Sequence, residues 1–313
     1  MKRSVKILLW ASLALFVAGI AIMCTALAIG GNDMIKTITG QSAVYEDYRT
    51  DITDISTIDL DFKGKRIDIY TTEGSQIEIS YARYDDESFE FNTQNGRFTA
   101  AFKSRQRWYS QLVFGMFSQI RDNTVRLGIP KEYAGNLNAS TNEGSVNLDS
   151  VNGLGEVRLT TSNGSIKVTG LVSQSLNLIT GNGSIKTADI TLTGDFNART
   201  TNGGITLNTV TCPFAELNST NASIRIEAAD INELFAATTN GAVRLDWLDT
   251  TRASFKTTNA SITGLLRGTK DQYSLTFSTT NGEVSPDPQA NPDAPRSIVA
   301  TTTNGRISFE FEN

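Results

Sequence analysis

One short pattern recurs nine times in the C-terminal part of the sequence, and each copy centres on an asparagine. Four copies have the form Thr-Thr-Asn-Gly-x-Ile/Val and the other five are close variants of it, and successive asparagines are 19 to 23 residues apart. A period of about twenty residues is typical of solenoids and other repeat architectures, in which each unit contacts its neighbours. The asparagines are Asn142, Asn163, Asn182, Asn202, Asn221, Asn240, Asn259, Asn281 and Asn304.

Apolar residues alternate on both sides of each asparagine. With the asparagine as position 0, positions −6 and −4 are apolar in every repeat from Asn163 onward, as at Val157 and Leu159. Position +3 is always isoleucine or valine, and position +5 is usually apolar. This alternation predicts one strand before and one strand after each asparagine, each with one buried face. The buried phase changes across the asparagine, which predicts a corner there.

Two architectures agree with this pattern: an antiparallel meander of hairpins and a parallel β-solenoid. A two-residue type I′ hairpin needs positive φ at both central residues, whereas two corners contain Asn221-Ala222 and Asn259-Ala260. A solenoid corner needs one residue in the left-handed region, which asparagine tolerates. The sequence therefore favours an all-β fold, a single-stranded parallel β-solenoid with coils of about twenty residues. The asparagines from Asn163 to Asn304 would form a structural corner ladder.

The chain ahead of the repeats is organised differently. Residues 53–131 contain short alternating segments, such as 58–62 and 67–70, which predict an N-terminal β region before the solenoid at 132–313. Within that region, apolar residues of 103–121 follow three-and-four spacing, which predicts a helical insertion. Residues 30–52 are expected to form a polar stalk.

An uncharged run at residues 7–29 predicts a membrane anchor. Its 23 residues would span about 34 Å as a helix, enough for a bilayer core of about 30 Å. Lys2, Arg3 and Lys6 precede the run, so the cytoplasmic tail 1–6 stays inside and the C-terminal domain lies outside a single-pass protein of the cell membrane. The alternative is a cleaved signal peptide, because Ala26-Leu27-Ala28 has a small-x-small form.

Composition excludes several kinds of chemistry. The chain has no histidine, which removes Ser-His-Asp and Cys-His nucleophile systems. Two cysteines, Cys24 and Cys212, cannot build a cysteine zinc site. We therefore expect no catalytic residues, metal site or cofactor. Without Lys2, Arg3 and Lys6, 25 basic residues face 33 acidic ones, and this acidic balance opposes binding to nucleic acid.

The motifs together resemble a known family. The Ile-x-Ile segments, then Val125-Arg126-Leu127-Gly128-Ile129-Pro130-Lys131, then the serial Thr-Thr-Asn-Gly-x-Ile/Val coils behind an anchor are similar to the DUF4097 family, also called the "putative adhesin" or toast-rack domain. The resemblance covers about residues 50–313. It implies a bacterial envelope β-solenoid, often associated with membrane-stress systems, and it brings no catalytic residues.

Two groups of residues are candidates for binding. Position +4 points outward and carries a basic row, Lys167, Lys186, Arg225 and Arg244, which could hold an anionic polymer. Glu227 and Asp246 lie at position +6 on the same face, so charge balancing would explain part of this row. The insertion offers Arg105, Arg107, Trp108, Tyr109, Leu112 and Phe117, either as a cap over the first coil or as a segment that docks on the membrane or a membrane protein.

These features favour a non-enzymatic cell-envelope protein. A membrane anchor would present the β-solenoid as a binding or assembly platform, such as an adhesin or an envelope-stress accessory, with an envelope polymer or a membrane protein as partner. The alternative is a carbohydrate-active β-helix enzyme that acts on cell-surface polysaccharide. Such enzymes need clustered carboxylates on one outer face, and the outward acidic positions of the repeats show no cluster.

Overall fold

The computed structural model describes residues 10–22, 25, 43–104, 122–288, 291 and 293–312. The chain divides into two units, of which the larger comprises Tyr45–Arg83, Glu87–Ser104 and Asn123–Asn313. The smaller comprises Met1–Val44, Tyr84–Asp86 and Arg105–Asp122. It contains a helix at 10–22 and a hydrogen bond from the Asp122 amide to Tyr84 Oη.

The predicted anchor is described only in part. Among the described residues, no helix is both long and apolar enough to cross a bilayer. The predicted span, 7–29, extends beyond the described residues, so it stays a prediction.

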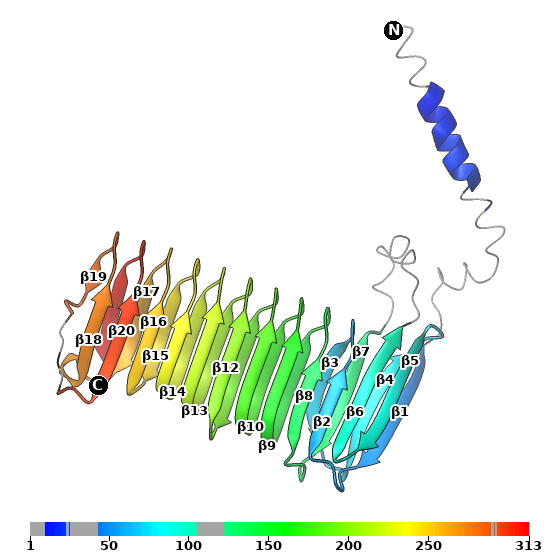
Figure 1. The fold of residues 1–313 in the computed structure, drawn as a ribbon, viewed down its shortest axis with the longest axis horizontal. Coiled ribbons are helices and arrows are strands. Elements are labelled where there is room, and N and C mark those ends of the chain that lie inside the picture. Colours follow the sequence, from blue (N-terminus) through cyan, green and yellow to red (C-terminus); the bar gives the residue numbers. More distant parts are fainter. Residues whose placement is uncertain are drawn as a thin grey trace. The chain divides into compact units, whose positions relative to one another are not determined.

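The repeats form a parallel β-solenoid, in which successive coils pair along the chain (Figure 1). Position +3 of one coil lies beside position +3 of the next: Ile166 beside Ile185, Ile185 beside Ile205, and so on to Ile262. The predicted parallel stacking is therefore confirmed for these coils. Their strands are β8 (Asn136–Ser140), β9 (Val146–Thr161), β10 (Ile166–Thr180), β11 (Ile185–Leu192), β12 (Asp195–Thr200), β13 (Ile205–Ser219), β14 (Ile224–Ala237), β15 (Val243–Asp249), β16 (Arg252–Lys256) and β17 (Ile262–Arg267).

The core lies inside the coils, where the alternation placed it. Residues at positions −6, −4 and +3 from Val157 to Ile307 are buried except for two in the outermost coil, Phe277 and Val284, which are half-buried. Large and small residues share one slot, as at Phe196 beside Ala215. Such a combination of large and small side chains is typical of close-packed protein interiors.

The bend with positive φ does not lie at the asparagine, so this expectation is wrong. Ser150, Gly170, Asp189, Thr209 and Ala228 have φ between 50° and 63°, and from the second repeat on they stand seven residues after the asparagine. At most corners glycine follows the asparagine, and its role there is close packing rather than a positive φ. A Cβ on Gly164 would lie 1.9 Å from the carbonyl oxygen of Gly144 in the preceding coil.

The first coils do not stack in chain order. β2 (Thr57–Asp61) lies between β6 (Arg97–Ser104) and β8, while β3 (Arg66–Thr72) lies between β7 (Thr124–Pro130) and β9. β4 (Gln76–Arg83) and β5 (Glu87–Gln94) pair antiparallel with β7 and β6 and close the end of the solenoid. β1 (Val44–Asp51), which falls within the expected stalk, is a strand and pairs with β4.

The last coils are also out of chain order (Figure 1). β20 (Arg296–Thr301) lies between β16 and β18 (Tyr273–Ser278), and β21 (Ile307–Glu312) lies between β17 and β19 (Val284–Ser285). A short 3-10 helix, η2 (Lys270–Gln272), precedes β18. After β17 the chain therefore skips one level of the stack and forms the outermost coil with β18 and β19. It then returns, and β20 and β21 fill the skipped level. This corrects the expectation that every coil stacks on its predecessor.

A buried ion pair lies near the N-terminal end of the solenoid. Lys65 is 2% exposed, and its Nζ lies 2.9 Å from both carboxylate oxygens of Glu87. The Lys65 ammonium also lies 4.6 Å from the centre of the Phe102 ring. Two charges this far from water persist because each neutralises the other and the ring adds a cation–π contact.

Candidate functional site

The corner asparagines form a continuous hydrogen-bonded ladder along one edge of the solenoid. Each Nδ2 donates to the Oδ1 of the asparagine in a neighbouring coil at 2.6 to 2.9 Å. The ladder runs through Asn163, Asn182, Asn202, Asn221, Asn240, Asn259, Asn304 and Asn281 in spatial order. The side-chain amides are thus satisfied by one another, which supports a structural role.

A buried hydroxyl fastens each corner from inside. Thr180 Oγ1 donates to the Gly164 carbonyl at 2.9 Å and accepts from the Gly183 amide at 3.2 Å. Equivalent bonds to the preceding coil recur at Thr161, Thr200, Ser219, Thr238 and Thr257. The Asn221-Ala222 corner keeps the bond through Thr238, so alanine there preserves the corner chemistry.

The register brings the predicted basic row together on one outer face. Lys167 lies beside Lys186, and Arg225 lies beside Arg244, with Thr206 between the two pairs. These positions share one sheet, on which coils repeat about every 4.8 Å. The ligand role of the row stays a prediction.

The four basic side chains differ in their charge partners. Arg225 contacts Glu227 and also lies 2.5 Å from Asp246, so its charge is compensated. In the described part of the chain, Lys167, Lys186 and Arg244 are exposed and form no ion pair. Only these three of the four predicted residues present uncompensated charge.

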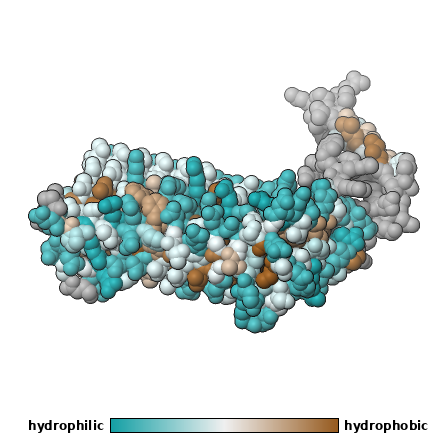
Figure 2. Space-filling view, turned by 60° about the horizontal axis from the view of Figure 1, so that its bottom comes forward, coloured by the Kyte–Doolittle hydropathy of each residue, from teal (hydrophilic) through white to brown (hydrophobic). Residues whose placement is uncertain are grey.

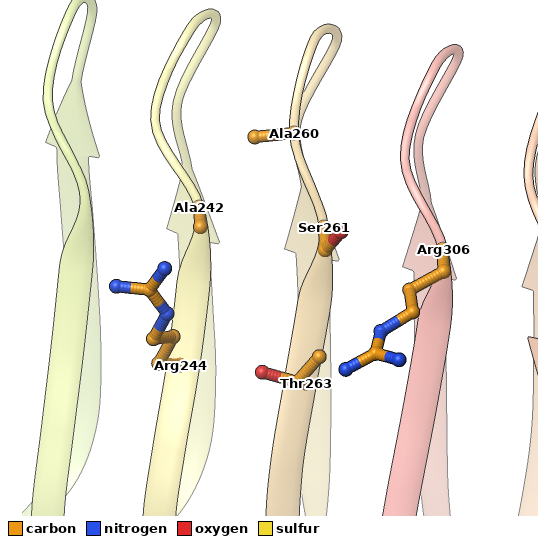
Figure 3. Close-up of a pocket in the computed structure, with 6 residues that line it drawn as sticks. All are labelled: Ala242, Arg244, Ala260, Ser261, Thr263 and Arg306. Atoms are coloured by element: carbon orange, nitrogen blue, oxygen red, sulfur yellow. The ribbon is translucent and has the colours of Figure 1, made fainter.

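A shallow groove of about 310 Å³ lies at one end of this row. Its lining residues are Ala242, Arg244, Ala260, Ser261, Thr263 and Arg306. Thr263 lies on β17 and Ser261 immediately precedes this strand, between the two arginines, and the Arg306 side chain extends toward Thr263 (Figure 3). Of these polar residues the sequence pattern indicated only Arg244; it did not indicate Arg306, Ser261 or Thr263, because the alternation gives no sign that the last coil inserts beside residues 261–263.

The outer surface of the described solenoid is largely polar. One face of the molecule is mostly hydrophilic, with scattered apolar residues (Figure 2). Among the described residues, the exposed large apolar side chains of the solenoid include Val172, Phe235 and Val299, which are 40 to 44% exposed.

Acidic side chains of the described residues form ion pairs rather than a metal-binding cluster. No group of three or more histidine, cysteine or acidic residues lies close enough among them to hold a metal. Instead, acidic side chains pair with arginine. Asp249 accepts from Arg267 at 2.7 Å and from Arg296 at 2.8 Å, and Glu233 accepts from Arg252 at 3.1 Å.

The insertion candidates lie outside the described residues. These are Arg105, Arg107, Trp108, Tyr109, Leu112 and Phe117, all within 105–121. Lys103 and Ser104, the first residues of the predicted insertion, belong to β6.

Similar structures have been solved for several bacterial proteins. A "putative lipid binding protein" from Parabacteroides distasonis ATCC 8503 is 13% identical with a TM-score of 0.49, and the match covers 85% of this chain and 96% of that chain. "Putative adhesins" from Bacteroides fragilis NCTC 9343 and Parabacteroides merdae ATCC 43184 are 12% and 13% identical, with TM-scores of 0.42 and 0.37. Both matches cover 87% of this chain and 98% of the other.

No curated protein matches the sequence significantly. A family model does match, and it spans residues 55–283, well over half of the chain. The chain belongs to the Toastrack DUF4097 family.

Proposed function

We propose that the protein is a non-enzymatic cell-envelope protein that presents its β-solenoid as a binding or assembly platform. Residues 7–29 would anchor it in the cell membrane with the N-terminus in the cytoplasm. The partner would be an envelope polymer or a membrane protein, as for an adhesin or an envelope-stress accessory, and not a nucleic acid.

One observation carries the proposal: a rigid, regular outer face holds exposed basic side chains without counter-charges. Lys167 and Lys186 lie on neighbouring coils of this face and Arg244 lies three coils further along it, and in the described part of the chain none of them forms an ion pair. A row of fixed charges on a parallel sheet matches a polymer with regularly spaced anionic groups. Two proteins of similar fold are described as "putative adhesins", which agrees with a binding platform by analogy of fold alone.

The arrangement of carboxylates gives no support to the alternative, a carbohydrate-active enzyme. Glycoside hydrolysis needs two carboxyl groups that flank a bound sugar at about 5 to 9.5 Å. The acids considered above instead engage arginine: Glu227 and Asp246 contact Arg225, and Asp249 contacts Arg267 and Arg296.

A co-sedimentation experiment tests the proposal. The full chain in neutral detergent is mixed with isolated cell envelopes stripped of protein, and the bound fraction is measured against envelope concentration. Saturable binding without release of reducing sugar ends is the expected result. Release of reducing ends would instead establish the enzyme, and an unsaturable or absent bound fraction would exclude binding to envelope polymer.

A further inference from the structure

The groove beside Arg244 is assembled from three neighbouring coils. Arg244 of β15 lies beside Thr263 of β17, and Thr263 lies beside Ser308 of β21, two residues after Arg306. The two arginines are far apart in the sequence, and the inserted last coil places them two levels apart. At about 4.8 Å per level, long guanidinium side chains from both sides can reach one ligand.

The charge of this groove is not neutralised by the protein. Among the described residues, the side chains of Arg244 and Arg306 form no ion pair and no hydrogen bond, and both residues are exposed. Asp246, two residues after Arg244, instead lies 2.5 Å from Arg225. Glu283, beside Arg306 in the outermost coil, forms no ion pair with it within the described ranges. Both arginines and both hydroxyl residues line this groove, in which the Arg306 side chain extends toward Thr263 and the Arg244 guanidinium lies on the side of its strand away from Thr263 (Figure 3).

The donor set indicates the class of ligand. Guanidinium groups donate paired hydrogen bonds to phosphate and carboxylate oxygens. The donors here come from three levels of the sheet rather than from one plane, because Ser261 and Thr263 stand between the arginines. A tetrahedral anion accepts from several directions, whereas a carboxylate accepts mainly in its own plane. A groove of about 310 Å³ is also large enough for a phosphate ester.

We propose that Arg244 and Arg306, with Ser261 and Thr263, bind a phosphate group, either as a free ion or within a phosphodiester polymer. This inference rests on the proposed platform function and gives it a specific site. The Lys186 and Lys167 side chains continue the same row away from the groove, so a polymer held in the groove would follow that row.

Isothermal titration calorimetry with inorganic phosphate tests the site, with the full chain in neutral detergent and phosphate-free buffer. Arg244→Gln and Arg306→Gln should each weaken binding about tenfold or more, since each removes charge-assisted hydrogen bonds. Arg199→Gln is the matched control. Arg199 is exposed, and it lies on the strand before the corner, on the other face. The Arg199→Gln substitution removes the same charge and should change the affinity for phosphate less than twofold.

The outcome separates the two sources of phosphate. Tighter binding of a glycerol-phosphate hexamer than of inorganic phosphate would identify a polymer as the ligand, and the reverse order would identify the free ion. Equal affinity of Arg244→Gln, Arg306→Gln and wild-type protein, with unchanged thermal transitions, would overturn the site. So would the absence of heat with both probes.

The phosphate titration and the co-sedimentation with envelopes can fail independently of each other. If the full chain sediments with envelopes and the two variants sediment equally well, the groove is wrong and the platform stands. If phosphate binds in the groove but envelopes are not bound, the platform is wrong and the anion site stands.

Discussion

A single hydroxyl at each corner makes two hydrogen bonds, one to the preceding coil and one within its own corner. Thr200 is 3% exposed, donates to the Gly183 carbonyl at 3.0 Å and accepts from the Gly203 amide at 3.1 Å. These bonds satisfy backbone groups that water cannot reach. Removing the hydroxyl leaves two buried polar groups without partners, which costs more than the net value of one hydrogen bond.

Thr200→Val should therefore destabilise the solenoid by about 2 to 4 kcal/mol, because a carbonyl and an amide lose their partner. Urea unfolding followed by circular dichroism measures the change. Thr191→Val serves as the control, since Thr191 is exposed and lies in the neighbouring strand β11. Equal stability of the two variants would contradict the role of the buried hydroxyl.

The buried Lys65–Glu87 pair gives a second prediction at this scale. Lys65→Met leaves the Glu87 carboxylate, 5% exposed, without its ammonium partner. Loss of one member of a buried pair costs about 3 to 5 kcal/mol. Thermal unfolding should show a large drop for Lys65→Met and a partial recovery for Lys65→Met with Glu87→Leu. A double variant less stable than the single one would contradict this account.

At the scale of the element, β1 depends on charged contacts as well as on backbone pairing. Glu46 accepts from Tyr81 Oη at 2.8 Å and pairs with Arg83 at 2.7 Å, both in β4. The hydrogen bond from Arg83 is the main cause that lowers the pKa of Glu46, and the Tyr81 hydroxyl lowers it further. The carboxylate form is therefore favoured while β1 is docked on β4.

Acid should release β1. Because the pKa of Glu46 is lower in the folded state, its contribution is complete above the unfolded pKa and is lost as pH falls through the folded pKa. Hydrogen exchange of the β1 amides, corrected for the intrinsic rate, should show weaker protection below about pH 4. Glu46→Gln should remove this pH dependence, and an unchanged profile in that variant would show that other groups cause it.

A second element-scale contact fastens the rearranged C-terminal coils. Asp249 in β15 accepts hydrogen bonds from Arg267 at the end of β17 and from Arg296 at the start of β20. Arg296 also donates to Tyr273 Oη of β18 at 2.9 Å. One carboxylate thus links coils that come from three separate stretches of sequence.

At the scale of the whole molecule, the terminal segments are held between other coils. The last strands, β20 and β21, have a neighbour on each side, and the first coil, β2 and β3, has the same arrangement. A terminal coil at the end of a stack would lose contacts on one side and fray. The exchange of order places β20 and β21, and also β2 and β3, between other strands of the stack.

Removal of the inserted coil should therefore be worse than removal of both last coils. A chain ending at 295 keeps β18 and β19 but deprives them of β20 and β21, with which they pair in the described part of the stack. A chain ending at 268 exposes the same inner coil without leaving Leu275 and Phe277 unpaired. The shorter chain should bind less of the dye ANS and melt at a higher temperature. The opposite ranking would show that β18 and β19 are held by other contacts.

The sequence alone determined the coil. The nine-fold pattern specified parallel strands, the inward residues at −6, −4 and +3, and the asparagine ladder, because these depend on alternation within one coil and on like residues in its neighbour. The tertiary structure decided the order of the end coils. Every coil presents the same Asn, Thr and Ile to whichever coil lies beside it, so the pattern cannot tell a neighbour in sequence from one in space. That order also placed Arg306 two levels from Arg244 beside the same groove, which is why Arg306 could not be found from spacing alone.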